Sequence, residues 1–306
     1  MNNASLTIIG APSSAGAYGP GQEKTPDAIR AAGLITLLEA RGISVTDQQN
    51  VTAYRWEVDQ QHKRVMNADK VVSTAKAVAQ KVSTALTETK KILVIGGDCT
   101  VEVGVVAGCL EHSENIGLIY IDLDTDLNTP SSVEDGALDW MGVAHLLQLA
   151  GTNEKLNSIG KKTPMLRAAL THFFAYGNMT DFEKEVIDKY KIKETNWQDV
   201  AKDPTGTASK ICQTWAPQFD RILIHLDLDV LDYVDMQLAE NYRRNMGLTF
   251  DQLMMALDEF MKLPNWTTLT ITEINPDHGK ADGSTLRIFA ERLAKSIRGS
   301  FSDFIP

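Results

Sequence analysis

Short runs of apolar, β-branched residues alternate with longer amphipathic segments along the whole chain. Several runs are continuously apolar, as is typical of strands that are covered by helices on both faces. The alternation predicts one doubly wound α/β domain, in which functional loops follow the carboxyl ends of the strands. The predicted strands are residues 6–10, 92–95, 116–121, 173–176, 221–226 and 268–272.

Helical periodicity appears between the predicted strands. Apolar positions recur at spacings of three and four at Val71, Ala75, Val78, Val82 and Leu86. One stripe of this helix should therefore face a core. Thr249 and Gln252 have the spacing of a capping box at the start of another helix. A shorter helix is predicted to begin near Pro26 and to end at Gly33.

Composition excludes several classes of protein. Of the 306 residues, 43% are hydrophobic, and the formal net charge is −10. Disorder and a membrane-spanning architecture are therefore not expected, and the acidic balance argues against a nucleic-acid partner. The first ten residues do not resemble a signal peptide, and three cysteines form no even disulfide framework, so we expect a cytoplasmic protein. No linker divides the chain, so residues 1–306 are predicted to form a single domain, and the basic pair Lys90 and Lys91 is expected to be solvated.

Two predicted strands lead directly into alternating aspartates. Asp122, Asp124 and Asp126 follow the strand at 116–121, and Asp227 and Asp229 follow the strand at 221–226. Alternate side chains of an extended segment share a face, so these carboxylates should converge at one edge of the sheet. A divalent cation such as Mg, Ca or Mn is the simplest way to neutralise them. The alternative is a set of solvated loop acids. An EF-hand is excluded, because its pattern of Gly and Glu positions is absent.

A third segment, residues 96–100, has the sequence Gly-Gly-Asp-Cys-Thr after an apolar strand. The two glycines permit a sharp turn, which places Asp98 and Cys99 at the end of the strand. Cys99 is a candidate thiolate ligand, since a nearby metal deprotonates a coordinating thiol. Its alternative is a buried, inert cysteine.

These motifs together resemble the arginase/agmatinase/formiminoglutamase family, the ureohydrolases. The similarity spans nearly the whole chain, and the motifs occur in the family's order. They lie at residues 8–12, 26–30, 96–100, 122–130, 227–232, 247–249 and 273–276. The resemblance implies a three-layer α/β/α domain with a mainly parallel sheet. It also implies a site with two manganese ions, or with Mg or another divalent cation, where a metal-activated hydroxide attacks a guanidino or formimino carbon.

The resemblance also implies roles for individual residues. The implied metal ligands are Cys99, Asp122, Asp124, Asp126, Asp227 and Asp229. Asp122 and Asp227 would bridge the two ions. The implied catalytic residues are Asp126, Asp139 and Glu273, and the implied substrate-binding residues are Asn128, Asp181 and Glu273. A carboxylate such as Glu273 is suited to pair with a guanidinium group. Relatives commonly form trimers or hexamers, so a homo-oligomer is expected.

The chain departs from the family pattern at its metal ligands. Cys99 and Asp124 stand where the family usually has histidine, so both imidazoles of the metal site are expected to be absent. A more anionic set of ligands would hold metal but make it a weaker Lewis acid. The family's proton-shuttle histidine is also missing. Asp139 is nearest to that position, and His145 and His278 are further candidates.

Three functional hypotheses remain open from the sequence. The first is a hydrolase of a linear guanidino or formimino compound, with the substrate itself undetermined. The second is an arginase-like protein with impaired catalysis that binds a metal, a ligand or a partner. The third is a Mg-dependent phosphatase of the haloacid-dehalogenase type, because Asp122 and Asp124 resemble that nucleophile motif. That motif normally lies on the first strand, which makes the phosphatase the weakest of the three.

Overall fold

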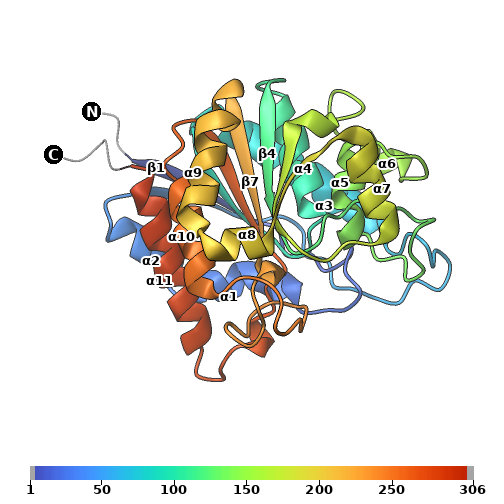
Figure 1. The fold of residues 1–306 in the computed structure, drawn as a ribbon. Helices are drawn as coiled ribbons and strands as arrows, with labels where there is room; N and C mark the ends of the chain where they lie inside the picture. The colour runs from blue at the N-terminus through green and yellow to red at the C-terminus, as the bar shows by residue number, and fades with distance from the viewer. Residues whose placement is uncertain (1–3, 302–306) are drawn as a thin grey trace.

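An eight-stranded, all-parallel sheet crosses the middle of the molecule in a computed structural model that describes residues 4–301. The order of strands is β2-β1-β3-β8-β7-β4-β5-β6, and helices cover both faces (Figure 1). The strands are β1 Ser5–Gly10, β2 Ser44–Asn50, β3 Ile92–Ile95, β4 Ile116–Ile121, β5 Thr171–Tyr176, β6 Lys193–Asn196, β7 Arg221–Asp227 and β8 Trp266–Thr272. The predicted parallel α/β architecture is confirmed.

The helices divide into two layers, each with its own apolar core (Figure 1). One layer contains α1 Thr25–Ala31, α2 Leu34–Glu39, α8 Trp197–Lys202, α9 Pro204–Thr214, α10 Phe250–Phe260 and α11 Ser284–Gly299. The other contains α3 Ala68–Ala85, α4 Val101–Leu110, α5 Gly142–Leu146, α6 Glu154–Asn157 and α7 Asp181–Tyr190. Within residues 4–301, no helix is both long and apolar enough to cross a membrane.

The continuously apolar strands supply both cores at once. In β3, Ile92 and Val94 belong to the core under α3 and α4, whereas Leu93 and Ile95 belong to the core on the opposite face. Successive side chains of a strand point to opposite faces, so a strand covered on both sides is mostly apolar, without alternation between polar and apolar positions. This is the physical reason why the inner strands could be recognised from the sequence.

The two edge strands, β2 and β6, were not predicted from the sequence because they are mostly polar. The sequence of β2 is Ser-Val-Thr-Asp-Gln-Gln-Asn, and it pairs only with β1. An edge strand is half solvated, and polar or charged residues there prevent it from pairing with other chains. Its polarity therefore follows from its position in the sheet rather than from a lack of strand structure.

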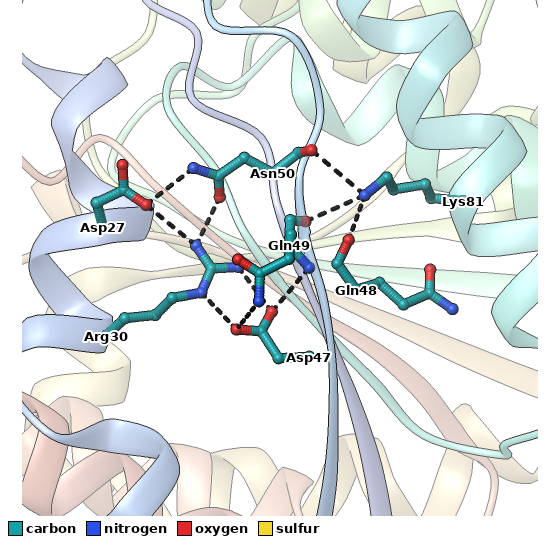
Figure 2. Close-up of polar contacts among 7 residues, drawn as sticks. All are labelled: Asp27, Arg30, Asp47, Gln48, Gln49, Asn50 and Lys81. Carbon is teal, nitrogen blue, oxygen red and sulfur yellow. Dashed lines mark hydrogen bonds and ion pairs between the residues drawn. The ribbon is translucent and has the colours of Figure 1, made fainter.

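Polar side chains hold the carboxyl end of β2 in place (Figure 2). The guanidinium of Arg30 on α1 binds Asp47 in two places, with Nε–Oδ2 and Nη2–Oδ1 distances of 2.9 Å each. Asn50 accepts a hydrogen bond from Arg30 and donates one to Asp27. The Nζ of Lys81 on α3 donates to the backbone carbonyls of residues 48–50. The edge strand is thus anchored to a helix on each face of the sheet.

Lys91 is buried, so the expectation that it is solvated was wrong. The residue is 9% exposed, and its Nζ lies 3.9 Å from the ring centroid of Trp266. Burial lowers the pKa of Lys91 to about 7. The unfolded chain therefore binds an extra proton between about pH 7 and the ordinary lysine pKa, and stability contributed by this site rises with pH across that window.

The variant Lys91→Met is expected to be more stable than the parent at pH 7 by about 1–3 kcal/mol, because it removes a desolvated polar group. The advantage should shrink as the pH rises from about 7 toward the ordinary lysine pKa, because the amine is neutral in both states only above that pKa. Denaturant unfolding at pH 6, 7 and 9.5 measures this. Lys90→Met is the matched control, since Lys90 is exposed and should change stability little at any of these values. A destabilised Lys91→Met at pH 6 would show instead that the cation–π contact with Trp266 outweighs desolvation.

Candidate metal centre

The candidate residues lie at the carboxyl ends of four neighbouring strands. In the sheet, β3, β8, β7 and β4 are adjacent in this order. Cys99 follows β3, Glu273 follows β8, Asp227 ends β7, and Asp122 follows β4. Ligands of open parallel sheets bind in this position, outside the carboxyl ends of the strands. The strand order therefore brings these side chains together at one edge of the sheet, as the sequence predicted for the carboxylates.

The turn that presents Cys99 requires close backbone contact. A Cβ atom on Gly97 would lie 1.7 Å from the carbonyl oxygen of Ser13, so only glycine fits. Asp98 is fully buried and stabilises the turn rather than facing the cavity. Its Oδ1 accepts from the backbone N of Thr100 at 3.1 Å, and its Oδ2 accepts from the N of Gly16 at 3.0 Å. The turn therefore holds Cys99 in a fixed place at the start of α4.

A first group of potential ligand atoms surrounds the Cys99 thiol. One atom from each of Cys99, Asp122, His225 and Asp227 lies within 4.8 Å of each of the others, and all four residues are buried. The thiol donates to Asp227 Oδ2 at 2.8 Å, and its Sγ lies 3.4 Å from His225 Nε2. Cys99 and Asp124 do stand at the two positions where the family usually has histidine, but His225 of β7 brings another imidazole into the cluster.

A second group contains Asp122, Asp124 and Asp229. Here two of the three carboxylates already have side-chain partners. Asp124 accepts hydrogen bonds from Asn178 and from the guanidinium of Arg243, and Asp229 accepts one from Asn241. The second group thus contains a positive charge, that of Arg243, next to Asp124, whereas no arginine or lysine belongs to the first group.

The carboxylates repel one another strongly in this buried site. Burial raises the pKa of Asp122 and Asp227 well above the usual range, and neighbouring carboxylates raise it further. Burial and Asp229 raise the pKa of Asp124 to about 6, although Arg243 opposes the shift. The pKa of the Cys99 thiol is also raised, first by burial and then by Asp227. Strong shifts of this kind indicate a functional site that is built to receive positive charge.

Asp126 and Glu273 have left-handed backbone conformations, with φ angles of 50° and 56°. Such conformations are unfavourable for residues other than glycine and persist where the surroundings enforce them, often at functional sites. Tyr120 of β4 donates its hydroxyl proton to Asp126 Oδ2. Glu273 is held on both oxygens, by the backbone N of Cys99 at 3.1 Å and by Gln22 Nε2 at 2.9 Å.

A narrow cavity opens above these residues. Its volume is about 20 Å³, which is room for one or two water-sized groups. Tyr18 and Trp140 stack at a centroid distance of 5.9 Å and form an aromatic part of its wall. The lining residues are Tyr18, Cys99, Asp124, Asp126, Asp139, Trp140, Asp227, Asp229, Asn241 and Glu273.

The two predicted substrate-binding residues Asn128 and Asp181 are not among the residues that line this cavity. Asn128 is buried, and its Oδ1 accepts from Ser132 Oγ at 2.9 Å and from Thr180 Oγ1 at 3.2 Å. Asp181 is exposed on the first turn of α7 and is not among the lining residues that the structure describes. The substrate-binding roles of Asn128 and Asp181 remain predictions.

The three candidate proton shuttles have different environments. Asp139 lines the cavity, whereas His145 is a structural histidine that bonds the carbonyl of Met141 at 2.6 Å and the backbone N of Asn153 at 3.1 Å. Burial lowers the pKa of His145 to about 4. His278 is tied to the carbonyl of Ala239 at 2.8 Å. Asp139 is therefore the shuttle candidate that faces the site.

The residues fit a divalent metal. Two buried carboxylate oxygens, Asp122 Oδ2 and Asp229 Oδ1, have no hydrogen-bond partner within the described chain. Buried polar atoms without partners are rare and costly, and a cation would satisfy both. Carboxylate oxygens, an imidazole and a thiolate are all common metal ligands.

Comparison with known proteins identifies the family. A family model described as the arginase family matches residues 4–297. The chain belongs to the arginase family. It is 29% identical to an arginase of Brevibacillus brevis over 75% of this chain and 77% of that protein. It is 26% identical to an arginase of Bacillus subtilis over 96% and 97%. The crystal structure of an arginase from Bacillus cereus superposes with a TM-score of 0.86 at 22% identity, covering 99% of this chain and 100% of that one.

Membership of the arginase family resolves one of the open hypotheses. The resemblance inferred from the ordered motifs is confirmed, and so is the arginase-like α/β fold. A haloacid-dehalogenase phosphatase is not supported, because the match covers nearly the whole chain and Asp122 follows the fourth strand rather than the first. Sequence reasoning missed several residues of the site region, because no motif assigned them a role. They include His225, Glu102 and Arg243, and Tyr18, Trp140 and Asn241 of the cavity wall.

Proposed function

We propose that this arginase-family protein hydrolyses the C–N bond of a linear guanidino or formimino compound at a divalent metal centre. The observation that carries the proposal is a cavity lined by buried carboxylates, with unpartnered oxygens on Asp229, which lines it, and on the neighbouring Asp122. Such a site attracts cations, both metal ions and a protonated guanidinium. The curated relatives named above are arginases, which supports a guanidino substrate.

The proposed metal ligands follow the family pattern. Cys99, Asp122, Asp126 and Asp227 would hold one ion, and Asp124 and Asp229 would hold a second, with Asp122 and Asp227 shared. The family usually employs two manganese ions, and Mg or another divalent cation is an alternative. When bound, the cations would supply Lewis acidity, which polarises the reacting carbon–nitrogen bond and lowers the pKa of water.

The protein's own groups would orient the substrate and move its protons. Glu273 faces the cavity in a fixed position and can accept hydrogen bonds from a guanidinium or formimino nitrogen. The stacked rings of Tyr18 and Trp140 offer an aromatic surface beside which a planar cation can lie. Burial, Asp98 and Asp126 raise the pKa of Asp139, so this carboxyl can hold a proton and pass it to the leaving nitrogen.

A second candidate function is binding without efficient catalysis. It is favoured by the contacts of Arg243, Asn178 and Asn241, which already satisfy oxygens of Asp124 and Asp229. If these contacts persist in solution, the second metal position stays blocked and the cluster holds fewer ions than the family's two.

Metal loading and product release test the proposal together. The full chain is stripped with a chelator and reloaded separately with Mn²⁺, Zn²⁺ and Co²⁺, and metal per chain is measured by elemental analysis. Each form is then assayed for urea, ammonia and formamide from arginine, agmatine, guanidinobutyrate and formiminoglutamate. We expect metal to bind and at least one compound to release product only in a loaded form. Metal binding without any product would support the second candidate, and no binding of any metal would overturn both.

A further inference from the structure

His225 and Glu102 form a buried pair beside the Cys99 thiol, outside every motif of the family pattern. We propose that His225 takes the place of Asp126 as a metal ligand, so that Cys99, His225, Asp122 and Asp227 form a sulfur–nitrogen–carboxylate site that prefers Zn²⁺ or Co²⁺ to Mn²⁺. The proposal rests on the metal-binding part of the proposed function. It refines the class of metal and assigns a ligand, and it does not depend on which substrate is hydrolysed.

The spacing of the donor atoms suits a single small cation. A sulfur about 2.3 Å and a nitrogen about 2.1 Å from one tetrahedral zinc ion lie about 3.6 Å apart. The distance between Cys99 Sγ and His225 Nε2 is 3.4 Å. Carboxylate oxygens of Asp122 and Asp227 complete a set of four atoms within 4.8 Å of one another. The four donors are thus already gathered around one point.

Glu102 orients the imidazole for this role. Its Oε2 lies 3.3 Å from His225 Nδ1, so Nδ1–H can donate to the carboxylate. Nε2 is then the acceptor nitrogen, and it lies 3.4 Å from Cys99 Sγ and 3.2 Å from Thr272 Oγ1. Histidines that bind metals usually donate their other ring N–H to a carboxylate or carbonyl in this way. The ring of Tyr120 is stacked on that of His225 at 4.0 Å with an interplanar angle of 3°, which fixes the ring plane.

Glu102 itself needs an explanation that packing does not give. It lies on α4 within an apolar helix, is 1% exposed, and its Oε1 has no partner among the described residues. A buried carboxylate is costly unless a positive group compensates it. A metal-bound imidazole carries positive charge to Nδ1–H, and this would strengthen its hydrogen bond to Glu102. The burial of Glu102 is therefore explained if His225 binds a cation through Nε2 and donates Nδ1–H to Glu102.

A cysteine nucleophile is the obvious alternative, since Cys99, His225 and Glu102 are arranged like a catalytic triad. The hydrogen bond from the thiol to Asp227 Oδ2 at 2.8 Å argues against it. A thiolate formed there without a cation would face a carboxylate at contact distance, which disfavours the nucleophilic form. A metal ion removes this conflict, because it binds both the thiolate and the carboxylate.

The proposed metal preference follows from the ligand types. Thiolate and imidazole favour Zn²⁺ and Co²⁺, whereas sites made of carboxylates and water suit Mn²⁺ and Mg²⁺. Any site binds Zn²⁺ more tightly than Mn²⁺ to some degree. The informative quantity is therefore how far the ratio of the two affinities depends on Cys99 and His225.

Cobalt spectroscopy on the full chain tests the assignment without an activity assay. The metal-free protein is titrated with Co²⁺, and Zn²⁺ and Mn²⁺ affinities are measured by competition. We expect a near-ultraviolet band from thiolate-to-cobalt charge transfer that disappears in Cys99→Ser. That variant should lower the Zn²⁺/Mn²⁺ affinity ratio at least about tenfold. His225→Gln should weaken Co²⁺ binding more than about 100-fold, and Glu102→Gln about 10- to 100-fold.

His172→Gln is the matched control, because His172 is also a buried histidine on a strand but bonds Thr195 Oγ1 at 3.0 Å, away from the site. It should leave Co²⁺ binding within about twofold of the parent. Thermal unfolding of each metal-free variant shows that it is folded, and the charge-transfer band reports on Cys99 even where affinity changes little. Metal binding with no thiolate band, or with His225→Gln unchanged, would overturn this assignment and leave the proposed function intact. Failure of the parent to bind any metal would overturn both.

Discussion

Replacing Asp227 with asparagine is expected to reduce the affinity for divalent metal by more than about 100-fold while making the metal-free protein more stable. Asp227 is shared in the proposed site, so its loss removes a ligand from both positions. In the metal-free chain the same carboxylate is buried among other acids, and removing it relieves repulsion worth about 0.5–2 kcal/mol. Asparagine Oδ1 can keep the hydrogen bond from the backbone N of Asp229, which is 2.7 Å in the parent. Calorimetric titration and thermal unfolding with and without metal measure the two effects.

Asp232→Asn is the control for both expected effects of Asp227→Asn, the weaker metal binding and the higher stability of the metal-free protein. Asp232 follows the same strand, but its Oδ1 accepts from the backbone N of Val234 at 2.9 Å and of Asn245 at 3.1 Å. Its role is to stabilise a turn, so the substitution should leave metal affinity unchanged and reduce stability slightly. If Asp227→Asn lowered the stability of the metal-free chain and kept its metal response, Asp227 would be a structural residue.

The inner strands and the aspartates could be predicted because one physical rule governs each of them. A strand covered by helices on both faces is apolar along most of its length, as β3 and β4 are. Polar side chains directly after such a strand lie at its carboxyl end, where ligands bind. Asp122, Asp227 and Glu273 were found in this way or through the family motifs. The edge strands β2 and β6 were missed because a half-solvated strand carries no such signal.

The remaining parts of the site depend on contacts between distant segments. Glu102 and His225 are 123 residues apart, and Asp124 and Arg243 are 119 apart. In the sequence, His225 is one residue in an apolar strand and Arg243 is half of a basic pair. Only the alignment of β7 beside β4 and β8 places His225 against the turn after β3. In the proposed site, the imidazole that the family usually has at the position of Cys99 would come from another strand, which motif comparison cannot detect.

The proposed replacement would also explain how metal binding can survive the loss of the family histidines. Cys99 would contribute a thiolate, and His225 would contribute the neutral donor. At the second metal position, Asp124 replaces a neutral histidine with a carboxylate, and Arg243 forms an ion pair with it in the structure. The two departures from the family pattern therefore differ in their consequences. At Cys99, the proposed site has a new set of ligands, whereas at Asp124 the guanidinium of Arg243 competes with a metal ion for the carboxylate.

Replacing Glu273 with glutamine is expected to reduce kcat/KM for a guanidino substrate by on the order of 100- to 1000-fold, with metal loading unchanged. Glutamine has nearly the same shape and can still accept from the backbone N of Cys99, but it carries no charge to pair with a cationic nitrogen. Loss of one partner of a buried, hydrogen-bonded charge pair has an effect of this size. The assay uses whichever compound the screen identifies, and metal per chain is measured on the same samples.

Glu240→Gln separates this role from a general effect of removing an acid near the cavity. Glu240 is also buried, and its backbone N donates to the carbonyl of Glu273 at 2.8 Å. Its side chain, however, accepts from Asn275 Nδ2 at 2.7 Å and does not line the described cavity. Its replacement should change kcat/KM by less than about tenfold, since no charge pair with substrate is lost. Equal losses in the two variants would mean that Glu273 acts through the local fold. A loss of metal in Glu273→Gln would assign the carboxylate to the metal centre instead of the substrate.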